Sequence, residues 1–573
     1  LIKYLNKKYL INKCNLKSEK IILNLKHYYE NLIIIDKKDV YQLLIYAVLA
    51  GLISLSIPLG IQSIINFIQA GQVSTSWIVL VFIVVIGVAF VGILKIMQFR
   101  ITENLQQKIF VRSSFEFAYR FPKIKFDQIY NYSPAELANR FFDTLTVQKG
   151  FSKLILEVST SVLQIIFGIL LLSLYHPFFI FFGLILLFLL YLIFKINFKN
   201  GLNTSLNESK YKYKVAYWLQ EIARNHLSFK NGKLFDFSLQ KNDNLVNEYL
   251  THRESHFNVL RKQFIQLTGF KVLITAGLLI IGGMLVLNQQ MNIGQFVAAE
   301  IIIITIITAV EKLFYGLELF YDVTTSLEKL GTVVDLELEN QNVETNYVIE
   351  DNSICIEAKE ISFQFPDSEV PVLKDVNLTV NKGDRILIQG ENGTGKTTLL
   401  RLLARLIEPS TGSIFLNDTN IKKYCIDDFR NNIGVITIDD SPFEGTIYEN
   451  ITCNNPEITK KEISLILEKL KLTDYIKSLP LGLDTLMVSE GKRINSASIQ
   501  KILLARCIIS NPKILFLEEP VEKLDKYAAG EIIDFLTSSE NPWTLVVIAK
   551  GNYWKEKCTK IVTLESNKIK SIK

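Results

Sequence analysis

Six long apolar stretches in the first 315 residues constrain this 573-residue chain more than any other feature of its sequence. They cover about 41–68, 77–99, 154–175, 177–196, 265–287 and 293–315. A helix that crosses the hydrocarbon core of a bilayer needs about 20 mostly apolar residues, and each stretch reaches that length. Because backbone polar groups must be satisfied within lipid, the sequence predicts six membrane-spanning helices.

The charges of the connections predict how these spans are oriented. Lys and Arg are concentrated in residues 1–40, 100–150 and 197–262, whereas the connections 69–76 and 288–292 contain neither. The positive-inside rule places the basic segments, and with them the C-terminal domain, on the cytoplasmic side of the inner membrane. The net charge of +6 gathers near apolar segments, which indicates contact with membrane lipid and argues against a nucleic-acid partner.

Two further features of the membrane part bear on function. The connections 100–150 and 197–262 keep a helical periodicity, so we expect the membrane helices to continue into the cytoplasm. Glu300 lies about two turns inside the sixth span, where an ionised group is costly. Two roles are possible for this carboxylate. It has a structural role, in which it is protonated or bonded to a neighbouring helix, or it faces a water-filled cavity between subunits. Glu311, nearer the interface, is expected to pair or snorkel.

The composition changes near residue 340 and predicts the domain organisation. A polar stretch is followed there by an alternating, β-branched segment that is typical of a strand. We expect an N-terminal cytoplasmic segment at 1–36 without a cleavable signal peptide, a six-helix membrane domain at 37–337, a linker at 338–352 and an α/β nucleotide-binding domain at 353–573.

The stretch GENGTGKTT at 390–398 has the sequence of a phosphate-binding loop. An apolar strand, 385–389, precedes it and an amphipathic helix follows it, as such a loop requires. Glycines allow the tight turn that points amide groups inward, and the lysine reaches the β- and γ-phosphates. The residues expected to hold the nucleotide are Gly390, Asn392, Gly393, Thr394, Gly395, Lys396, Thr397 and Thr398.

A second apolar strand, KILFLEEP at 513–520, ends in two carboxylates. Carboxylates at the end of such a strand hold Mg²⁺ and polarise the attacking water in phosphoryl transfer. With the Thr397 hydroxyl as a further ligand, Thr397 and Glu518 are the expected metal-binding residues, and Glu519 is the expected catalytic residue. ATP and Mg²⁺ are therefore the expected cofactors.

Taken together, the six spans and these motifs resemble a half-unit of an ABC transporter of the exporter type, from about residue 36 to the end. SLEKLGTVVDL at 326–336 and LPLGLDT at 479–485 carry the resemblance further, and the membrane part is similar to type I secretion exporters. The resemblance implies that Phe365 stacks on adenine, which suits the face of an aromatic ring. It also implies a second half-transporter as partner, in a homodimer or heterodimer.

Several positions depart from the pattern of this family. The switch-loop glutamine falls on Ile438, the switch histidine on Lys550 and the Walker B aspartate on Glu518. The LSGGQ signature falls on INSAS at 494–498, which lacks both glycines, although Ser496 keeps a hydroxyl that could bond a phosphate oxygen. Ile438 cannot orient a water, and Lys550 lacks the acceptor nitrogen of neutral imidazole. The resemblance therefore predicts good ATP binding and slow hydrolysis.

Two functions are compatible with these residues. The first is an exporter subunit that moves a substrate out of the cytoplasm, with weak or partner-dependent ATP hydrolysis and a periplasmic adaptor as a further partner. The second is a membrane scaffold or sensor that binds ATP without transport. Retained Glu519 and Glu300 favour the first, whereas Ile438, INSAS and Lys550 favour the second.

Overall fold

The computed structural model describes residues 36–69, 75–130, 132–339, 349, 354–488, 491 and 494–573. Nearly all of the expected N-terminal segment and most of the expected linker lie outside these residues. The chain forms two compact units. One contains Tyr132–Leu336 and the described residues up to Pro122; the other contains Glu337–Lys573 together with Lys123–Asn131.

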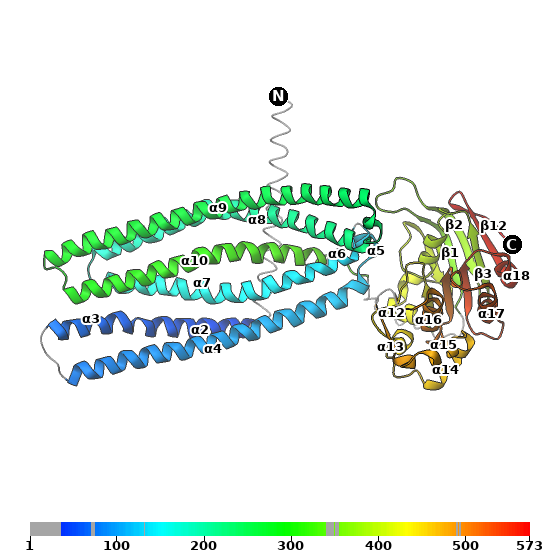
Figure 1. Ribbon diagram of the computed structural model, residues 1–573, viewed down its shortest axis with the longest axis horizontal. Helices are drawn as coiled ribbons and strands as arrows, with labels where there is room; N and C mark the ends of the chain where they lie inside the picture. The colour runs from blue at the N-terminus through cyan, green and yellow to red at the C-terminus, as the bar shows by residue number, and fades with distance from the viewer. Residues whose placement is uncertain are drawn as a thin grey trace, which may run out of the picture. The chain divides into compact units, whose positions relative to one another are not determined.

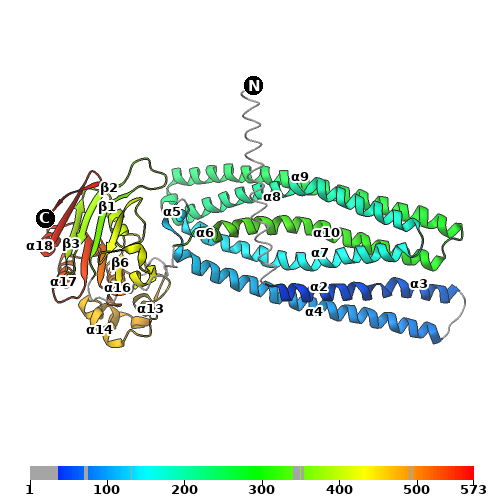
Figure 2. The same cartoon turned by 180° about the vertical axis from the view of Figure 1, so that it is seen from behind.

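In the described part of the chain, six helical segments are long and apolar enough to cross a membrane, which confirms the predicted spans. The first is divided into α2 (Lys37–Ser54) and α3 (Ser56–Gln69), and the others are α4 (Thr75–Arg120), α7 (Asp143–Ser173), α8 (Phe178–Arg224), α9 (Gly232–Leu287) and α10 (Ile293–Val334). Within this unit α7 packs against α10, α8 against α9 and α2 against α4 (Figure 1, Figure 2). Between α4 and α7 the chain forms η1 (Phe121–Lys123), α5 (Phe126–Ile129), α6 (Pro134–Asn139) and η2 (Arg140–Phe142).

The ends of these helices follow from local sequence. The first span is interrupted at Leu55, three residues before Pro58, whose missing N–H removes one helical hydrogen bond. Helix α10 begins with a capping box, in which the Asn292 side chain accepts from the Gln295 amide at 2.7 Å and the Gln295 side chain accepts from the Asn292 amide at 2.9 Å. This cap fixes the start of the sixth span.

The helices extend well beyond a bilayer, as their periodicity predicts. Helices α8 and α9 contain 47 and 56 residues. At a rise of 1.5 Å per residue they are about 70 and 84 Å long, whereas the hydrocarbon core of a bilayer is about 30 Å thick. More than half of each helix therefore lies outside the apolar layer.

Where α8, α9 and α10 meet, packing is close enough to exclude a side chain. A Cβ atom on Gly201 would lie 2.3 Å from the ring of Tyr321, which is fully buried. The Tyr321 hydroxyl donates to the Asn197 carbonyl at 3.4 Å and accepts from Gln263 at 3.3 Å. The glycine thus allows a buried polar side chain to join three helices with its hydrogen bonds satisfied.

The carboxylates of the sixth span occupy different surroundings. Glu311 forms an ion pair with Lys271 of α9, as expected for a charged group near the membrane interface. Glu300 lies within α10 and is half-buried. Because an ionised group within the apolar layer is costly, this carboxylate needs compensation in either of its two roles.

The second unit is an α/β domain, which confirms the expected fold class. Its central sheet has the order β12-β11-β3-β10-β9-β6 among the described residues. These strands are β12 (Lys568–Ile572), β11 (Lys560–Glu565), β3 (Arg385–Gly390), β10 (Thr544–Ile548), β9 (Ile514–Glu518) and β6 (Ile433–Ile436). All are mutually parallel except β12, which pairs antiparallel with β11.

Two further sheets complete the domain. An antiparallel sheet contains β1 (Ile356–Phe363), β2 (Leu373–Val380), β4 (Thr411–Leu416) and β5 (Thr419–Asn420), and a small one pairs β7 (Gly445–Thr446) with β8 (Leu486–Met487). The α-helices of this domain are α11 (Lys396–Leu403), α12 (Ile426–Asn431), α13 (Ile447–Thr452), α14 (Lys460–Lys469), α15 (Thr473–Ser478), α16 (Ser496–Ile508), α17 (Lys526–Thr537) and α18 (Asn552–Lys557). Its short 3₁₀ turns are η4 (Ile421–Lys423) and η5 (Gly482–Asp484), and a further one, η3 (Ser228–Lys230), belongs to the membrane unit.

The central strands are apolar throughout because both faces of the sheet are covered. Along β9, Ile514 and Phe516 pack into one core with α11 and the antiparallel sheet, whereas Leu515 and Leu517 pack into another with α14, α16 and α17. In the sheet register, Ile548 lies opposite both Ile388 and Glu518. Strands β9 and β10 therefore end level with one another, β3 continues two residues further to Gly390, and the segments that follow these strands meet at one edge.

Candidate nucleotide-binding site

The phosphate loop connects β3 to α11 at this edge of the sheet. Gly395 has φ +90° and Gly390 has φ +154°, and a Cβ on either would lie within 3 Å of neighbouring atoms, Leu373 Cδ2 for Gly395 and the Leu564 carbonyl oxygen for Gly390. Only glycine fits such close backbone approaches. The loop thus leads directly into the N-terminus of α11, where free amide groups and the helix dipole favour an anion.

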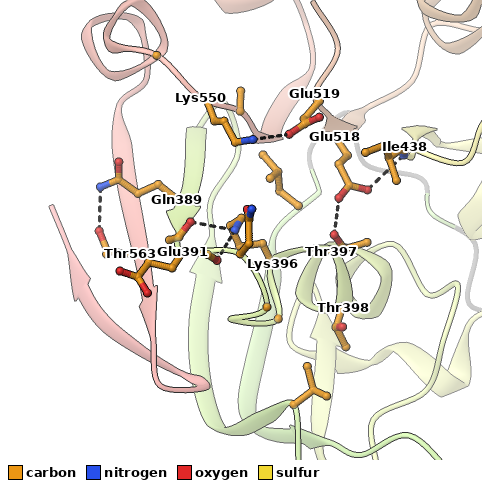
Figure 3. Close-up of a pocket in the computed structure, with 18 of the residues that line it drawn as sticks. Gln389, Glu391, Lys396, Thr397, Thr398, Ile438, Glu518, Glu519, Lys550 and Thr563 are labelled. Carbon is orange, nitrogen blue, oxygen red and sulfur yellow. Dashed lines mark hydrogen bonds and ion pairs between the residues drawn. The ribbon is translucent and has the colours of Figure 1, made fainter. Parts of the chain in front are cut away.

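Lys396 is the first residue of α11 and bends back over the loop (Figure 3). Its ammonium group donates to the carbonyls of Gly390 at 2.9 Å and Glu391 at 2.6 Å. Burial, and secondarily the charge of Lys550, lower the pKa of Lys396. The carboxylates of Glu519 and Glu518 act in the opposite direction but do not outweigh these two effects, so a ligand that brings further negative charge would stabilise the ammonium group.

The next residue, Thr397, contacts the end of β9. Its hydroxyl donates to Glu518 Oε1, while Glu518 Oε2 accepts from the Ile438 amide at 3.3 Å (Figure 3). Glu518 is buried, with 6% of its surface exposed. A hydroxyl and a buried carboxylate side by side are the hard oxygen donors that Mg²⁺ prefers, so these two residues fit the metal expected here.

Glu519 occupies a constrained backbone conformation. Its φ is +47°, which is uncommon for a residue with a side chain. Its amide donates to the Ile548 carbonyl at 2.8 Å, and its own carbonyl accepts from Gln500 Nε2 at 2.6 Å. The side-chain oxygen of Gln500, Oε1, accepts a hydrogen bond from the backbone N–H of Lys523 at 2.9 Å. Gln500 therefore holds the segment that carries the expected catalytic carboxylate, a role that the motif analysis missed.

The Glu519 carboxylate faces Lys550, which follows β10. The two groups form an ion pair of 3.5 Å between Nζ and Oε1 (Figure 3). The Lys550 side chain is 72% exposed, so its chain can also turn toward a ligand. In this arrangement the lysine neutralises the carboxylate rather than presenting an acceptor nitrogen to a water.

A cavity of about 860 Å³ unites most of the predicted site residues. Of the described residues, those that line it include Phe365, Gly390, Asn392, Gly393, Gly395, Lys396, Thr397, Thr398, Glu518 and Glu519, together with Ile438, Lys550 and Lys555. Two predicted residues are not among these lining residues: Thr394, whose hydroxyl instead donates to the Glu391 carbonyl at 2.9 Å, and Ser496. The volume lies within the range of small-molecule sites.

Ser496 lies apart, in the first turn of α16, and is exposed. The residue before it, Asn495, is the N-cap, and its side chain accepts from the Ser498 amide at 2.7 Å. This cap uses one of the free amides that a helix N-terminus offers to an anion. The INSAS segment is thus a capped helix start.

The organisation of the whole chain can be compared with that of known proteins. The family model for the ABC transporter transmembrane region matches residues 40–310, and the family model for the ABC transporter matches residues 373–522. The chain belongs to the ABC transporters. It is a half-transporter of the exporter type, with one six-span region followed by one nucleotide-binding domain.

Two relatives of this half-transporter are putative multidrug export ATP-binding/permease proteins of Staphylococcus aureus, from strains NCTC 8325 and COL. Each is 32% identical over 214 residues, which is 37% of either chain, so the chain spans little more than a third of these relatives. A bacterial Atm1-family ABC exporter with ATP bound has a similar structure. It matches 94% of the half-transporter and 95% of its own chain with a TM-score of 0.81 and 17% identity, which shows a shared fold.

Proposed function

We propose that this half-transporter pairs with a second half-transporter in the inner membrane and exports a substrate from the cytoplasm, using ATP that it binds well and hydrolyses slowly. Lys396, the glycines of the loop and the N-terminus of α11 receive the phosphates. Phe365 stacks on adenine, and Thr397 with Glu518 holds Mg²⁺. The metal would supply charge neutralisation at the phosphates. Basic cytoplasmic connections contact membrane lipid, and Ser496 of this chain faces the nucleotide bound by the second half-transporter.

The observation that carries slow hydrolysis is the pairing of Glu519 with Lys550. A carboxylate accepts a proton from water best when no cation competes for its charge, so the ion pair weakens Glu519 as a base. The side chain of Ile438, 62% exposed at the cavity, gives a water no hydrogen bond. The Asn495 cap on α16 further reduces the amides available to a phosphate.

Phosphate release by the purified full chain in lipid nanodiscs tests this proposal. We expect slow release from Mg-ATP that falls about tenfold in Glu519→Gln. This is less than the usual effect of removing a general base, because the other catalytic groups are already replaced and such groups act as a unit. Glu522→Gln, an exposed carboxylate that does not line the nucleotide cavity among the described residues, serves as the matched control.

The same measurement separates export from the scaffold or sensor function. A scaffold that only binds ATP would show no release by the wild type above the background measured without protein. Release that is unchanged by Glu519→Gln would remove this residue from the reaction. ATP-driven conformational cycling in nanodiscs, followed by a distance label on α8 and its counterpart, would support the exporter, and a single ATP-held conformation would support the scaffold.

A further inference from the structure

The aromatic ring of the nucleotide cavity is itself stacked on another ring. Phe365 lies two residues beyond the end of β1, so the sheet does not fix its orientation. The Tyr130 ring lies nearly parallel to it, with 5.2 Å between centroids and 23° between planes. Phe363 meets Phe365 edge-on at 5.0 Å and 89°. Offset stacking on one side and an edge contact on another are the two favourable aromatic geometries, and together they fix the ring.

Tyr130 approaches Phe365 from outside the cavity. Among the described residues, Phe365 lines the cavity that contains the phosphate loop, and Tyr130 is not one of the lining residues. Phe126 of α5 adds a third ring, 5.8 Å from Tyr130 and 6.3 Å from Phe365. Phe126 and Phe365 both pack against the same hydrophobic core. Tyr130 therefore backs Phe365 and leaves the cavity side of the ring accessible to a ligand.

The segment that carries Tyr130 is firmly attached to the nucleotide-binding unit. Ile124 forms a β-bridge with Leu338, the Lys125 amide donates to the Glu337 carbonyl at 3.0 Å, and the Glu339 amide donates to the Lys123 carbonyl at 2.7 Å. The Lys125 and Glu337 side chains pair at 2.8 Å, which raises the pKa of the lysine and lowers that of the carboxyl. These bonds hold the backbone that precedes α5.

A bidentate ion pair extends this attachment into the domain. Glu339 accepts from both terminal nitrogens of Arg430 on α12, at 2.7 and 2.9 Å. Such two-point pairing fixes direction as well as distance. Residues 123–130 therefore lie on a rigid base, and the Tyr130 ring is placed by that base rather than by the mobility of a loop.

We propose that Tyr130 is a positioning residue of the nucleotide site, which holds Phe365 in the plane on which the base stacks and so sets affinity for the base rather than for the phosphates. This inference rests on the proposed binding of ATP in this cavity. Without the tyrosine ring, Phe365 would gain rotamer freedom that nucleotide binding must then remove, and such ordering weakens affinity.

Equilibrium binding to the full chain in nanodiscs tests the inference with two probes, Mg-ATP and inorganic tripolyphosphate, which lacks the base. We expect Tyr130→Ala to weaken ATP binding by about three- to tenfold, the range of one aromatic stacking contact, and to leave tripolyphosphate binding unchanged. Tyr130→Phe keeps the ring and should bind ATP as the wild type does. Tyr132→Ala is the matched control, because the Tyr132 ring lies under Arg140 at 5.4 Å instead.

A double-mutant cycle shows whether Tyr130 acts through Phe365. We expect Phe365→Ala to weaken ATP binding and Tyr130→Ala to add no further loss in that background, since contacting residues are not additive. Additive losses, equal losses for both probes, or no effect of Phe365→Ala would overturn the inference. Tighter ATP binding by Tyr130→Ala would overturn it too, because the tyrosine would then occupy the place of the base.

Failure of this inference is distinct from failure of the proposed function. If Tyr130→Ala has no selective effect while Lys396→Ala abolishes ATP binding, the nucleotide site stands and only the role of Tyr130 falls. If the wild type and Lys396→Ala bind ATP equally, the proposed site falls and the inference with it. Thermal unfolding without nucleotide checks that Tyr130→Ala is folded, and Tyr130→Leu repeats the test with an apolar side chain of intermediate size.

Discussion

Restoring glutamine, histidine and glycines at the replaced positions raises phosphate release by about 10²–10³-fold over the wild type, the effect of a preorganised transition-state contact. The variant combines Ile438→Gln, Lys550→His, Ser496→Gly and Ala497→Gly. Phosphoryl transfer leaves little covalent work to the protein, so its rate depends on positioning and charge. The glutamine would orient a water near Glu518 and Glu519, and the imidazole would end the ion pair that now neutralises Glu519.

The components of this variant should act as a unit. Ile438→Gln alone is expected to raise the rate less than tenfold, because Lys550 still pairs with Glu519. A control that combines Leu465→Gln on α14 with Lys557→His on α18 makes similar chemical changes; Leu465 is 55% exposed and Lys557 pairs with Asp534 at 2.6 Å. The control should leave release unchanged. A wild-type rate equal to that of the restored variant would show that the residues present are competent replacements.

Lys396→Ala abolishes detectable ATP binding. The ammonium group already bends over the loop and donates to the carbonyls of Gly390 and Glu391, from which an anion can draw it. Losing a charge-assisted partner of the phosphates lowers affinity by about 10²–10³-fold. Equilibrium binding of a fluorescent ATP analogue to the full chain measures the change.

Lys382→Ala provides the matched control for this experiment. Lys382 is exposed on the turn before β3, and it is not one of the described residues that line the nucleotide cavity. Its removal takes away the same charge without touching the phosphate loop, so ATP binding should persist. Equal retention of nucleotide by Lys396→Ala and the wild type would mean that ATP binds elsewhere or not at all.

The phosphate loop was predictable from the sequence because everything that shapes it is local. The strand 385–389, the glycines and the first turn of α11 are consecutive, and the structure assembles them as expected. The six spans were predictable for a similar reason, since the requirement for apolar length acts on each segment separately. The interruption of the first span at Leu55 could also have been predicted, because Pro58 lacks the backbone N–H that a continuous helix would use.

Contacts between distant segments had no comparable signal. Gln500 holds the backbone of Glu519, and Tyr130 stacks on Phe365, but neither pair has a fixed spacing that a single sequence reveals. The Asn495 cap could have been predicted, because asparagine is a favoured N-cap residue. Ser496 lies outside the cavity since, in the proposed pairing, it would face the nucleotide of another subunit.

The helices that cross the bilayer are long enough for a small tilt at the membrane surface to become a large displacement at their far ends. If about 50 Å of an arm such as α9 lies beyond the apolar layer, a tilt of about 10° at the membrane surface displaces the arm's tip by about 9 Å, more than one turn of helix. Gly201 allows Tyr321 to pack closely against α8. Side-chain rearrangements of about an ångström at this contact would produce a displacement several times larger at the cytoplasmic ends of the helices. Stiffness over that distance is what the uninterrupted 56-residue helix provides.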